Sequence, residues 1–239
     1  MHNATEEGNA MTTWGWNVIE FGIDFFEMLI TCYLAYHLFS SQKERSSPAR
    51  IKLFIFSLSG TIIQFVSEQG LLPIPDLFPV VLTFLLYAVI VCRAKIIQAF
   101  LWSLVNCLVL GITTISLSSL ISLFLHTAVE NLFSYSGYRI MFLVINKIAQ
   151  LSITELIIRI AKHGKLQTSQ RGGNALILFS LFSIFSLLLL WKIEYIQTPN
   201  IILFFNLFIC MLLLCMNFSL MFFLSFVKKA SEEKFRRTE

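Results

Sequence analysis

Residues 19–30 of this 239-residue chain read IEFGIDFFEMLI, an apolar run that nevertheless contains Glu20, Asp24 and Glu27. On an α-helix these three side chains lie within an arc of about 60°, because successive residues are about 100° apart. A stripe of carboxylates is costly in a segment that lies in a membrane. Its meaning therefore depends on whether this segment crosses one.

The composition of the whole chain answers that question. Hydrophobic residues make up 56% of it and charged residues only 13%, whereas a soluble domain has about 25% charged residues. Apolar runs recur along the chain and leave no polar stretch long enough for a soluble catalytic domain. We therefore predict an all-α, polytopic membrane protein. The five cysteines all lie in apolar runs, which favours buried thiols over disulfides or a zinc site.

The apolar runs predict seven transmembrane helices. A spanning helix needs about 20 residues, and the second, third and sixth runs need flanking residues to reach that length. The seven runs are residues 14–39, 51–66, 77–92, 96–125, 138–160, 175–190 and 201–227. The chain then divides into an N-terminal segment (1–13), a membrane domain (14–227) and a C-terminal segment (228–239).

The basic residues predict the orientation of these spans. If the N-terminus is outside, nearly all of the 18 Lys and Arg residues fall in cytoplasmic segments. Only Arg139 and Lys192 then lie outside, and Lys147 lies within a span. Because basic residues concentrate on the cytoplasmic side, we expect the N-terminus outside and the C-terminus in the cytoplasm.

Depth in the membrane suggests a partner for the carboxylate stripe. Trp14 marks the expected outer boundary, so Asp24 lies about 15 Å below it at 1.5 Å per residue. Lys147, in the fifth predicted span, lies at nearly the same depth below the outer end of that span. We expect the first and fifth spans to face each other, with Asp24 and Lys147 coupled. The alternative partners for Lys147 are Glu20 and Glu27.

Gln150 extends the candidate site along the fifth span, because residues three apart are neighbours on a helix. The residues proposed for ligand binding or coupling are Glu20, Asp24, Glu27, Lys147 and Gln150. Three interpretations stay open: a structural ion pair beside protonated carboxylates, a site of ligand binding or coupling, and a proton pathway. Three amides elsewhere in the spans are predicted to form interhelical hydrogen bonds. They are Gln64, Asn106 and Asn217.

The sequence carries no recognisable catalytic motif. It lacks the HExxH pattern of zinc proteases, a phosphate-binding glycine loop and a nucleotide-binding fingerprint. Its histidines and cysteines do not share a membrane depth, which disfavours a nucleophilic pair. We expect no cofactor and no bound metal, and the basic loops favour anionic lipids over nucleic acid as a partner.

The C-terminal stretch LSFVKKASEEKFRRTE (224–239) predicts a helix that runs past the membrane surface. No glycine or proline interrupts it, and Glu232 with Arg236 and Glu233 with Arg237 form favourable i,i+4 pairs. We expect this helix to continue into a cytoplasmic module of a longer protein. A short basic tail is the alternative.

These features together resemble the sensor region of Agr-type peptide-receptor histidine kinases of Gram-positive bacteria. The likeness covers nearly the whole chain. It rests on the first-span pattern WNVIEFGIDFFEMLITCYLAYHLF (16–39), the basic segment after it, and the last span running into VKKASEEKFRRTE (227–239). The resemblance implies a bacterial plasma-membrane location, a homodimer and an extracellular, often cyclic, peptide that binds the outer half of the bundle.

The same resemblance implies that the last helix signals to a phosphoacceptor histidine and a GHKL-type ATPase domain, neither of which is in this chain. Kinase activity and a response-regulator partner would belong to the longer protein. We therefore expect a seven-span sensor domain of two-component, quorum-sensing signalling. The alternative is a small transporter or channel whose pathway is formed by Glu20, Asp24, Glu27 and Lys147.

Overall fold

The computed structural model describes most of the chain up to residue 164 and parts of the remainder. The described residues are 3–40, 47–68, 77–126, 129–133, 137–164, 180–181, 183–186, 205, 208–213, 215–217 and 219. Across these ranges every regular element is a helix and none is a strand, which confirms the all-α prediction.

Six α-helices and one π-helical turn follow one another in the described residues up to 164. They are α1 (Asn3–Phe39), α2 (Ser47–Glu68), α3 (Leu77–Leu86), η2 (Tyr87–Val91), α4 (Ile96–Leu125), α5 (Val129–Phe133) and α6 (Gly137–Gly164). Pro48 and Pro79 both stand in the first turn of their helices, where a missing backbone N–H costs nothing. The helix interiors therefore contain no proline to kink them over these ranges.

Three of the described helices are long and apolar enough to cross a membrane by themselves. They are Ile51–Glu68 within α2, Ile96–Leu125 (α4) and Gly137–Ala161 within α6. α1 is long enough but less apolar, because Glu20, Asp24 and Glu27 interrupt it, and the α3–η2 unit (Leu77–Val91) is shorter. These helices give the chain the character of a membrane protein. The count of seven spans stays a prediction, since 175–190 and 201–227 lie largely outside the described residues.

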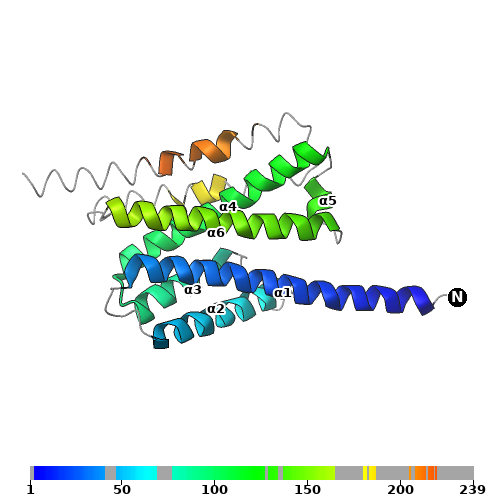
Figure 1. Cartoon of the computed structure of the whole chain (residues 1–239), viewed down its shortest axis with the longest axis horizontal. Coiled ribbons are helices and arrows are strands. Elements are labelled where there is room, and N and C mark those ends of the chain that lie inside the picture. Colours follow the sequence, from blue (N-terminus) through cyan, green and yellow to red (C-terminus); the bar gives the residue numbers. More distant parts are fainter. Residues whose placement is uncertain are drawn as a thin grey trace, which may run out of the picture.

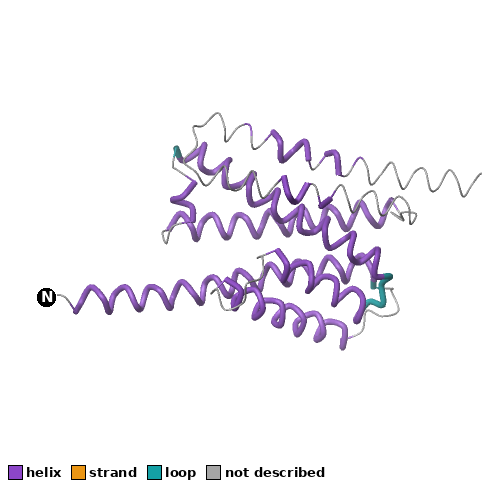
Figure 2. The backbone as a smooth tube through the Cα atoms, turned by 180° about the vertical axis from the view of Figure 1, so that it is seen from behind, coloured by secondary structure: helices purple, strands orange, loops and turns teal. Residues whose placement is uncertain are grey.

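The helix boundaries agree with the predicted spans except at α1. α4 has the bounds expected from its apolar run, and α2, α3 with η2, and α6 correspond to the second, third and fifth runs. α1 begins at Asn3, whereas the first span was expected from Trp14. The acidic residues Glu6 and Glu7 lie close to that N-terminus, where negative charge favours the helix dipole. Figures 1 and 2 show this end of α1 extending beyond the other helices.

α1 is the central element of the described bundle. It contacts α2, α3 and η2 on one side and α6 and α4 on the other, and Figure 1 shows α2 and α3 below it and α6 and α4 above. The largest apolar cluster joins α1, α3, η2, α4 and α6 around the fully buried Leu34, Phe84 and Tyr87. The carboxylate stripe therefore lies on a helix that has neighbours on both flanks.

A glycine allows α2 to pack closely against α1 and α3. A Cβ atom placed on Gly60 would lie 2.4 Å from Thr83 Oγ1 and 3.0 Å from Met28 Sδ. Small residues commonly occupy such helix contacts in membranes, because they let the backbones approach each other. Gly60 therefore helps to set the distances between α1, α2 and α3.

Two helix ends are closed by residues in the left-handed conformation. Arg93 (φ 52°) follows η2, where the Ala94 N–H donates to the Ala88 carbonyl at 2.9 Å. His126 (φ 49°) caps α4, and its backbone N–H donates to the Ser122 carbonyl. Such ends satisfy carbonyl groups that have no partner inside the helix.

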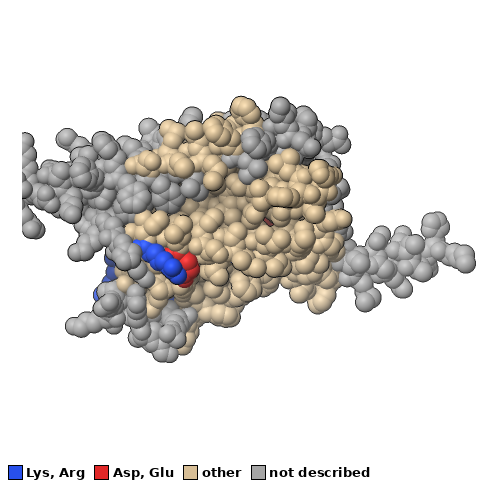
Figure 3. All heavy atoms as spheres, turned by 45° about the horizontal axis from the view of Figure 1, so that its top comes forward, with Lys and Arg blue, Asp and Glu red and all other residues tan. Residues whose placement is uncertain are grey.

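The visible surface of the described helices is mostly uncharged. Figure 3 shows one face on which acidic and basic residues gather only in a small patch near one end. Large apolar side chains are exposed along the helices, among them Phe54 and Ile62 on α2, Phe124 on α4 and Ile148 on α6. An apolar surface of this extent suits contact with lipid tails and would promote aggregation in water.

Candidate functional site: a polar network centred on α1

α1 and α6 run parallel and are joined by polar side chains at regular intervals. The contacts between described residues are Glu20 with Arg139, Glu27 with Lys147, and Tyr33 with Glu155. The partners are separated by 119, 120 and 122 residues, so both helices advance together in the same direction. This confirms the prediction that the first and fifth spans face each other.

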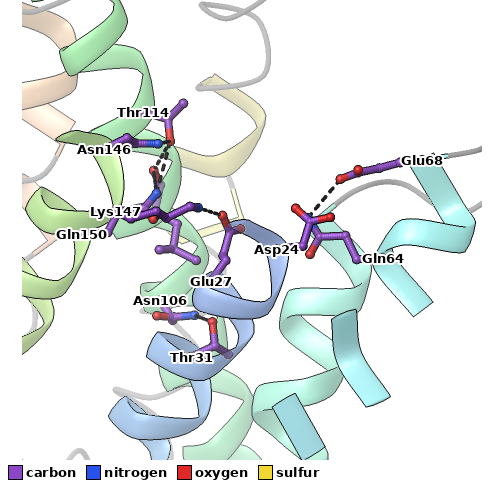
Figure 4. Close-up of polar contacts among 11 residues, drawn as sticks. Asp24, Glu27, Thr31, Gln64, Glu68, Asn106, Thr114, Asn146, Lys147 and Gln150 are labelled. Carbon is purple, nitrogen blue, oxygen red and sulfur yellow. Dashed lines mark hydrogen bonds and ion pairs between the residues drawn. The ribbon is translucent and has the colours of Figure 1, made fainter. Parts of the chain in front are cut away.

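Lys147 forms its ion pair with Glu27, not with Asp24, so the predicted direct pair of Asp24 and Lys147 is wrong. Its ammonium group also donates to Gln150 Oε1 at 3.1 Å. Figure 4 shows Glu27 directed toward Lys147 and Asp24 directed toward α2. The two carboxylates lie about 60° apart around α1, which is enough for them to face different neighbours. Depth identified the correct pair of helices, but the rotation of α1 decides which carboxylate meets Lys147.

From Lys147 the network continues into α4. Gln150 is 1% exposed, and its Nε2 donates to Thr114 Oγ1 at 3.3 Å and to the Leu110 carbonyl at 3.5 Å. Asn146 Nδ2 donates to the same Thr114 oxygen at 3.1 Å. The chain of contacts drawn in Figure 4 therefore links α1, α6 and α4. Each interhelical hydrogen bond in a membrane contributes on the order of 1 kcal/mol.

Asp24 lies on the other flank of α1, against α2. Gln64 Nε2 donates to Asp24 Oδ1 at 3.2 Å and to Glu68 Oε1 at 3.0 Å. Asp24 is 7% exposed and Gln64 is 6% exposed. Within the part of the chain that the structure describes, Asp24 has no ion pair, and Asp24 Oδ2 and Gln64 Oε1 accept no hydrogen bond.

The predicted interhelical hydrogen bonds of the three amides are present. Gln64 bonds to Asp24 as above, and Asn106 Nδ2 donates to Thr31 Oγ1 at 3.1 Å between α4 and α1. Asn217 Nδ2 donates to Ser183 Oγ at 3.0 Å, which connects described parts of the sixth and seventh predicted spans.

The structure adds Arg139 to the site, where sequence reasoning placed it only on the outer surface. Besides its pair with Glu20, Arg139 donates to the Phe133 carbonyl at 2.6 Å and lies over the Trp16 ring at 5.8 Å. A signal for it exists in the sequence. Acidic residues seven apart on the first span, Glu20 and Glu27, match basic residues eight apart on the fifth span.

The described residues bring together no group of three or more His, Cys, Asp or Glu side chains suited to a metal ion. Cys32, Cys92, Cys107 and Cys210 are buried thiols, as predicted, whereas Cys215 is exposed. The network can therefore join helices and stabilise buried charged groups. Its described groups do not include a nucleophile beside a base.

Comparison of the chain with protein-family models, with curated proteins and with solved structures found no match. The resemblance to Agr-type sensor regions stays a prediction from the sequence pattern. The functional conclusion below rests on the residues and geometry of this chain.

Proposed function

We propose that this chain is a membrane sensor domain with seven spans, an external N-terminus and a cytoplasmic C-terminus. It binds an extracellular peptide at the outer end of the bundle. Through its last span it passes the resulting change to a cytoplasmic histidine kinase module of a longer protein. The observation that carries this proposal is the use of the α1 and α6 charges to fasten those two helices to each other.

A transport pathway and a sensor make opposite demands on such charges. A pathway needs ionisable groups that are free to bind and release the transported species, whereas a sensor needs helices that move as rigid units. Glu20, Glu27 and Lys147 are engaged in ion pairs, and Gln150 is hydrogen-bonded to α4. Three of the four residues of the alternative pathway are therefore committed to helix contacts, which favours the sensor.

The expected outer end offers a surface suited to a peptide. Arg139 is held there by the Glu20 carboxylate, the Phe133 carbonyl and the Trp16 ring. Trp14, two residues before Trp16 on the same helix, is 74% exposed. Aromatic rings beside a fixed guanidinium group can bind apolar and carboxylate groups of a short peptide. A ligand that bound here would touch α1 and α6 together.

Peptide capture tests this proposal. The chain is reconstituted in lipid nanodiscs and incubated with the small peptides secreted by the cells that make it, and retained peptides are identified by mass spectrometry. We expect a peptide that is absent from empty nanodiscs. Trp16→Ala should lower its retention at least about tenfold, equivalent to about 1.4 kcal/mol. Ile90→Ala, an exposed position at the other end of the bundle, should leave retention unchanged.

One observation favours the transporter: the buried carboxyl group of Asp24 forms no ion pair with any of the described basic residues. Flux measurements in proteoliposomes decide between the two functions. Protons and sodium should not cross faster than through empty liposomes if the chain is a sensor. Flux that disappears in Asp24→Asn, together with no retained peptide, would replace the sensor by the transporter.

A further inference from the structure

Asp24 and Gln64 share one hydrogen bond, and each keeps an unused acceptor. The Gln64 amide donates its two hydrogens to Asp24 Oδ1 and Glu68 Oε1, so it has none left to donate. Asp24 Oδ2 and Gln64 Oε1 are both buried, and the described part of the chain supplies a donor to neither. Buried polar atoms are almost always paired, so two orphaned acceptors on bonded neighbours indicate a missing donor.

One hydrogen satisfies both atoms. A carboxylic acid and a primary amide can form a cyclic pair with two hydrogen bonds. In one bond the amide N–H donates to a carboxyl oxygen, and this bond already joins Gln64 to Asp24. In the other the carboxyl O–H donates to the amide carbonyl. A proton on Asp24 Oδ2 would supply that second donor for Gln64 Oε1, because the existing bond already holds the two groups against each other.

Lys147 is the described cation that interacts with Asp24, and its ammonium group is already paired with Glu27. On α2, Glu68 adds a second carboxylate at the C-terminal end of a helix whose last turn contains no basic residue. α3, η2 and α4 contain no Asp, Glu, Lys, Arg or His within Leu77–Leu86, Tyr87–Val91 and Ile96–Leu125, and they contribute only weakly acidic groups such as the Tyr87 hydroxyl and the Cys107 thiol.

The two α6 cations that form ion pairs with α1 are matched to carboxylates other than Asp24. On α1 itself the neighbouring carboxylates are Glu20 and Glu27. On α6, Arg139 and Lys147 form ion pairs with Glu20 and Glu27. The other basic residues of α6, Arg159 and Lys162, follow Lys147 by at least twelve residues. An ionised Asp24 would therefore be a buried negative charge that interacts with the carboxylates of Glu68, Glu27 and Glu20 and has no counterion of its own, which is a costly arrangement in an apolar bundle.

The geometry points to Asp24 and Gln64 as a proton-binding site at the contact between α1 and α2, in which Asp24 is held as the neutral acid. This site goes beyond the sensor function and does not depend on it. Loss of the proton breaks the cyclic pair and sets the Asp24 carboxylate beside Glu68 across one amide. The α1–α2 contact is thereby linked to the protonation of a single residue near the expected outer end of α2.

The chain offers a direct test because it contains only two aspartates, Asp24 and Asp76. Protein carrying Asp76→Asn is produced with aspartate labelled by carbon-13 at the side-chain carboxyl, so that Asp24 is the only labelled aspartate. Isotope-edited infrared spectra are recorded in lipid nanodiscs at neutral pH. We expect the carbonyl band of a protonated carboxyl group. The paired bands of a carboxylate at neutral pH would overturn the assignment, and movement of those bands on adding sodium or calcium would reassign the site to a metal cation.

Gln64→Leu in the same labelled protein tests the cyclic pair. Loss of both hydrogen bonds should move the Asp24 carbonyl band to higher frequency. Gln98→Leu, which removes a partly buried amide near the start of α4, should leave the band in place. An unmoved band in Gln64→Leu would show that Gln64 is not the acceptor and would overturn the pairing. The spectrum of the parent protein does not depend on whether this variant folds.

Discussion

At the scale of single residues, Lys147 shows how the bundle holds a charge. Its side chain is 11% exposed, and its ammonium group meets a carboxylate on α1 and an amide carbonyl on its own helix. Placing such a charge at the centre of a membrane costs about 2.5–3.5 kcal/mol on the insertion scale. The ion pair with Glu27 offsets part of that cost. Removing either partner should therefore leave the other buried charge without this compensation.

We predict that Lys147→Met and Glu27→Gln each lower the free energy of unfolding and that the double variant recovers part of the loss. The physical reason is that each single variant leaves one buried polar group without its partner. The coupling energy in a double-mutant cycle should be about 1–2 kcal/mol, the range of strong interhelical hydrogen bonds. Unfolding in detergent mixtures, followed by circular dichroism, provides the measurement.

Asp24→Asn supplies the matched control for that cycle. It changes a carboxyl group on the α2 flank of the same helix, and its effect should add to that of Lys147→Met within about 0.5 kcal/mol. A coupling with Asp24 larger than the coupling with Glu27 would restore the pair expected from depth and contradict the geometry.

At the scale of elements, the contact of α2 with α1 and α3 depends on the absence of a side chain at Gly60. We predict that Gly60→Ala lowers the free energy of unfolding by about 1–3 kcal/mol, the usual cost of overpacking. The added methyl group would meet Thr83 Oγ1 at 2.4 Å and Met28 Sδ at 3.0 Å, so a helix must shift. The same unfolding measurement applies.

Gly22→Ala is the control for the effect of alanine in a helix. A Cβ atom at Gly22 meets nothing within 4 Å. Alanine there should raise the free energy of unfolding by about 0.5–1 kcal/mol, because glycine weakens a helix interior. Equal gains at Gly60 and Gly22 would mean that helix propensity and not packing governs both positions.

The elements also show how far the sequence predicts this structure. The bounds of α4 follow from the length of its apolar run. The pairing of α1 with α6 follows from opposite charges at similar depths, and each depth can be counted along a single predicted span. The choice of Glu27 over Asp24 could not be predicted, because it depends on the rotation of α1, which the packing of large side chains such as Phe84 and Tyr87 determines. The π-helical turn at Tyr87–Val91 likewise has no counterpart in the sequence pattern, which predicted only an apolar helix over these residues.

At the scale of the whole molecule, the parallel direction of α1 and α6 agrees with the proposed path through the membrane. In the sequence, α2, the α3–η2 unit and α4 come between α1 and α6. In the proposed topology these three units are alternating crossings that return the chain to the side on which α1 begins. The short α5 lies between α4 and α6 without being long enough to cross. The proposed outer location of Trp16 and Arg139 at one end follows from this alternation and from the distribution of basic residues.

Topology is tested by single cysteines in a variant that lacks the native cysteines. We predict that a cysteine at Lys165 resists a membrane-impermeant reagent in intact cells, whereas a cysteine at Leu71 reacts, because basic residues concentrate on the cytoplasmic side. Both positions lie outside the described residues. Labelling at position 165 with protection at position 71 would reverse the orientation and with it the location proposed for the ligand.

The relay from the last span is the prediction that separates sensor from transporter most sharply. Residues 201–237, largely outside the described part of the chain, are expected to form one continuous helix that extends about 15 Å past the membrane surface. Spin labels placed singly along 228–237, in protein that includes any downstream sequence, should show mobility with a helical period. Uniformly high mobility from Lys228 onward would contradict a relay. In a longer protein, two glycines inserted after Lys229 should abolish output and leave ligand binding intact.

The wide separation in sequence between α1 and α6 has a consequence for how this protein is made. The partners of Glu20 and Glu27 emerge from the ribosome 119 and 120 residues after them, which is roughly 6–24 seconds at typical synthesis rates. Gln64 follows Asp24 by only 40 residues and becomes available much earlier. The first helical hairpin should therefore form while two acidic residues of α1 still await their counterions. During biogenesis α1 then needs either the aqueous interior of the insertion machinery or bound protons until α6 arrives.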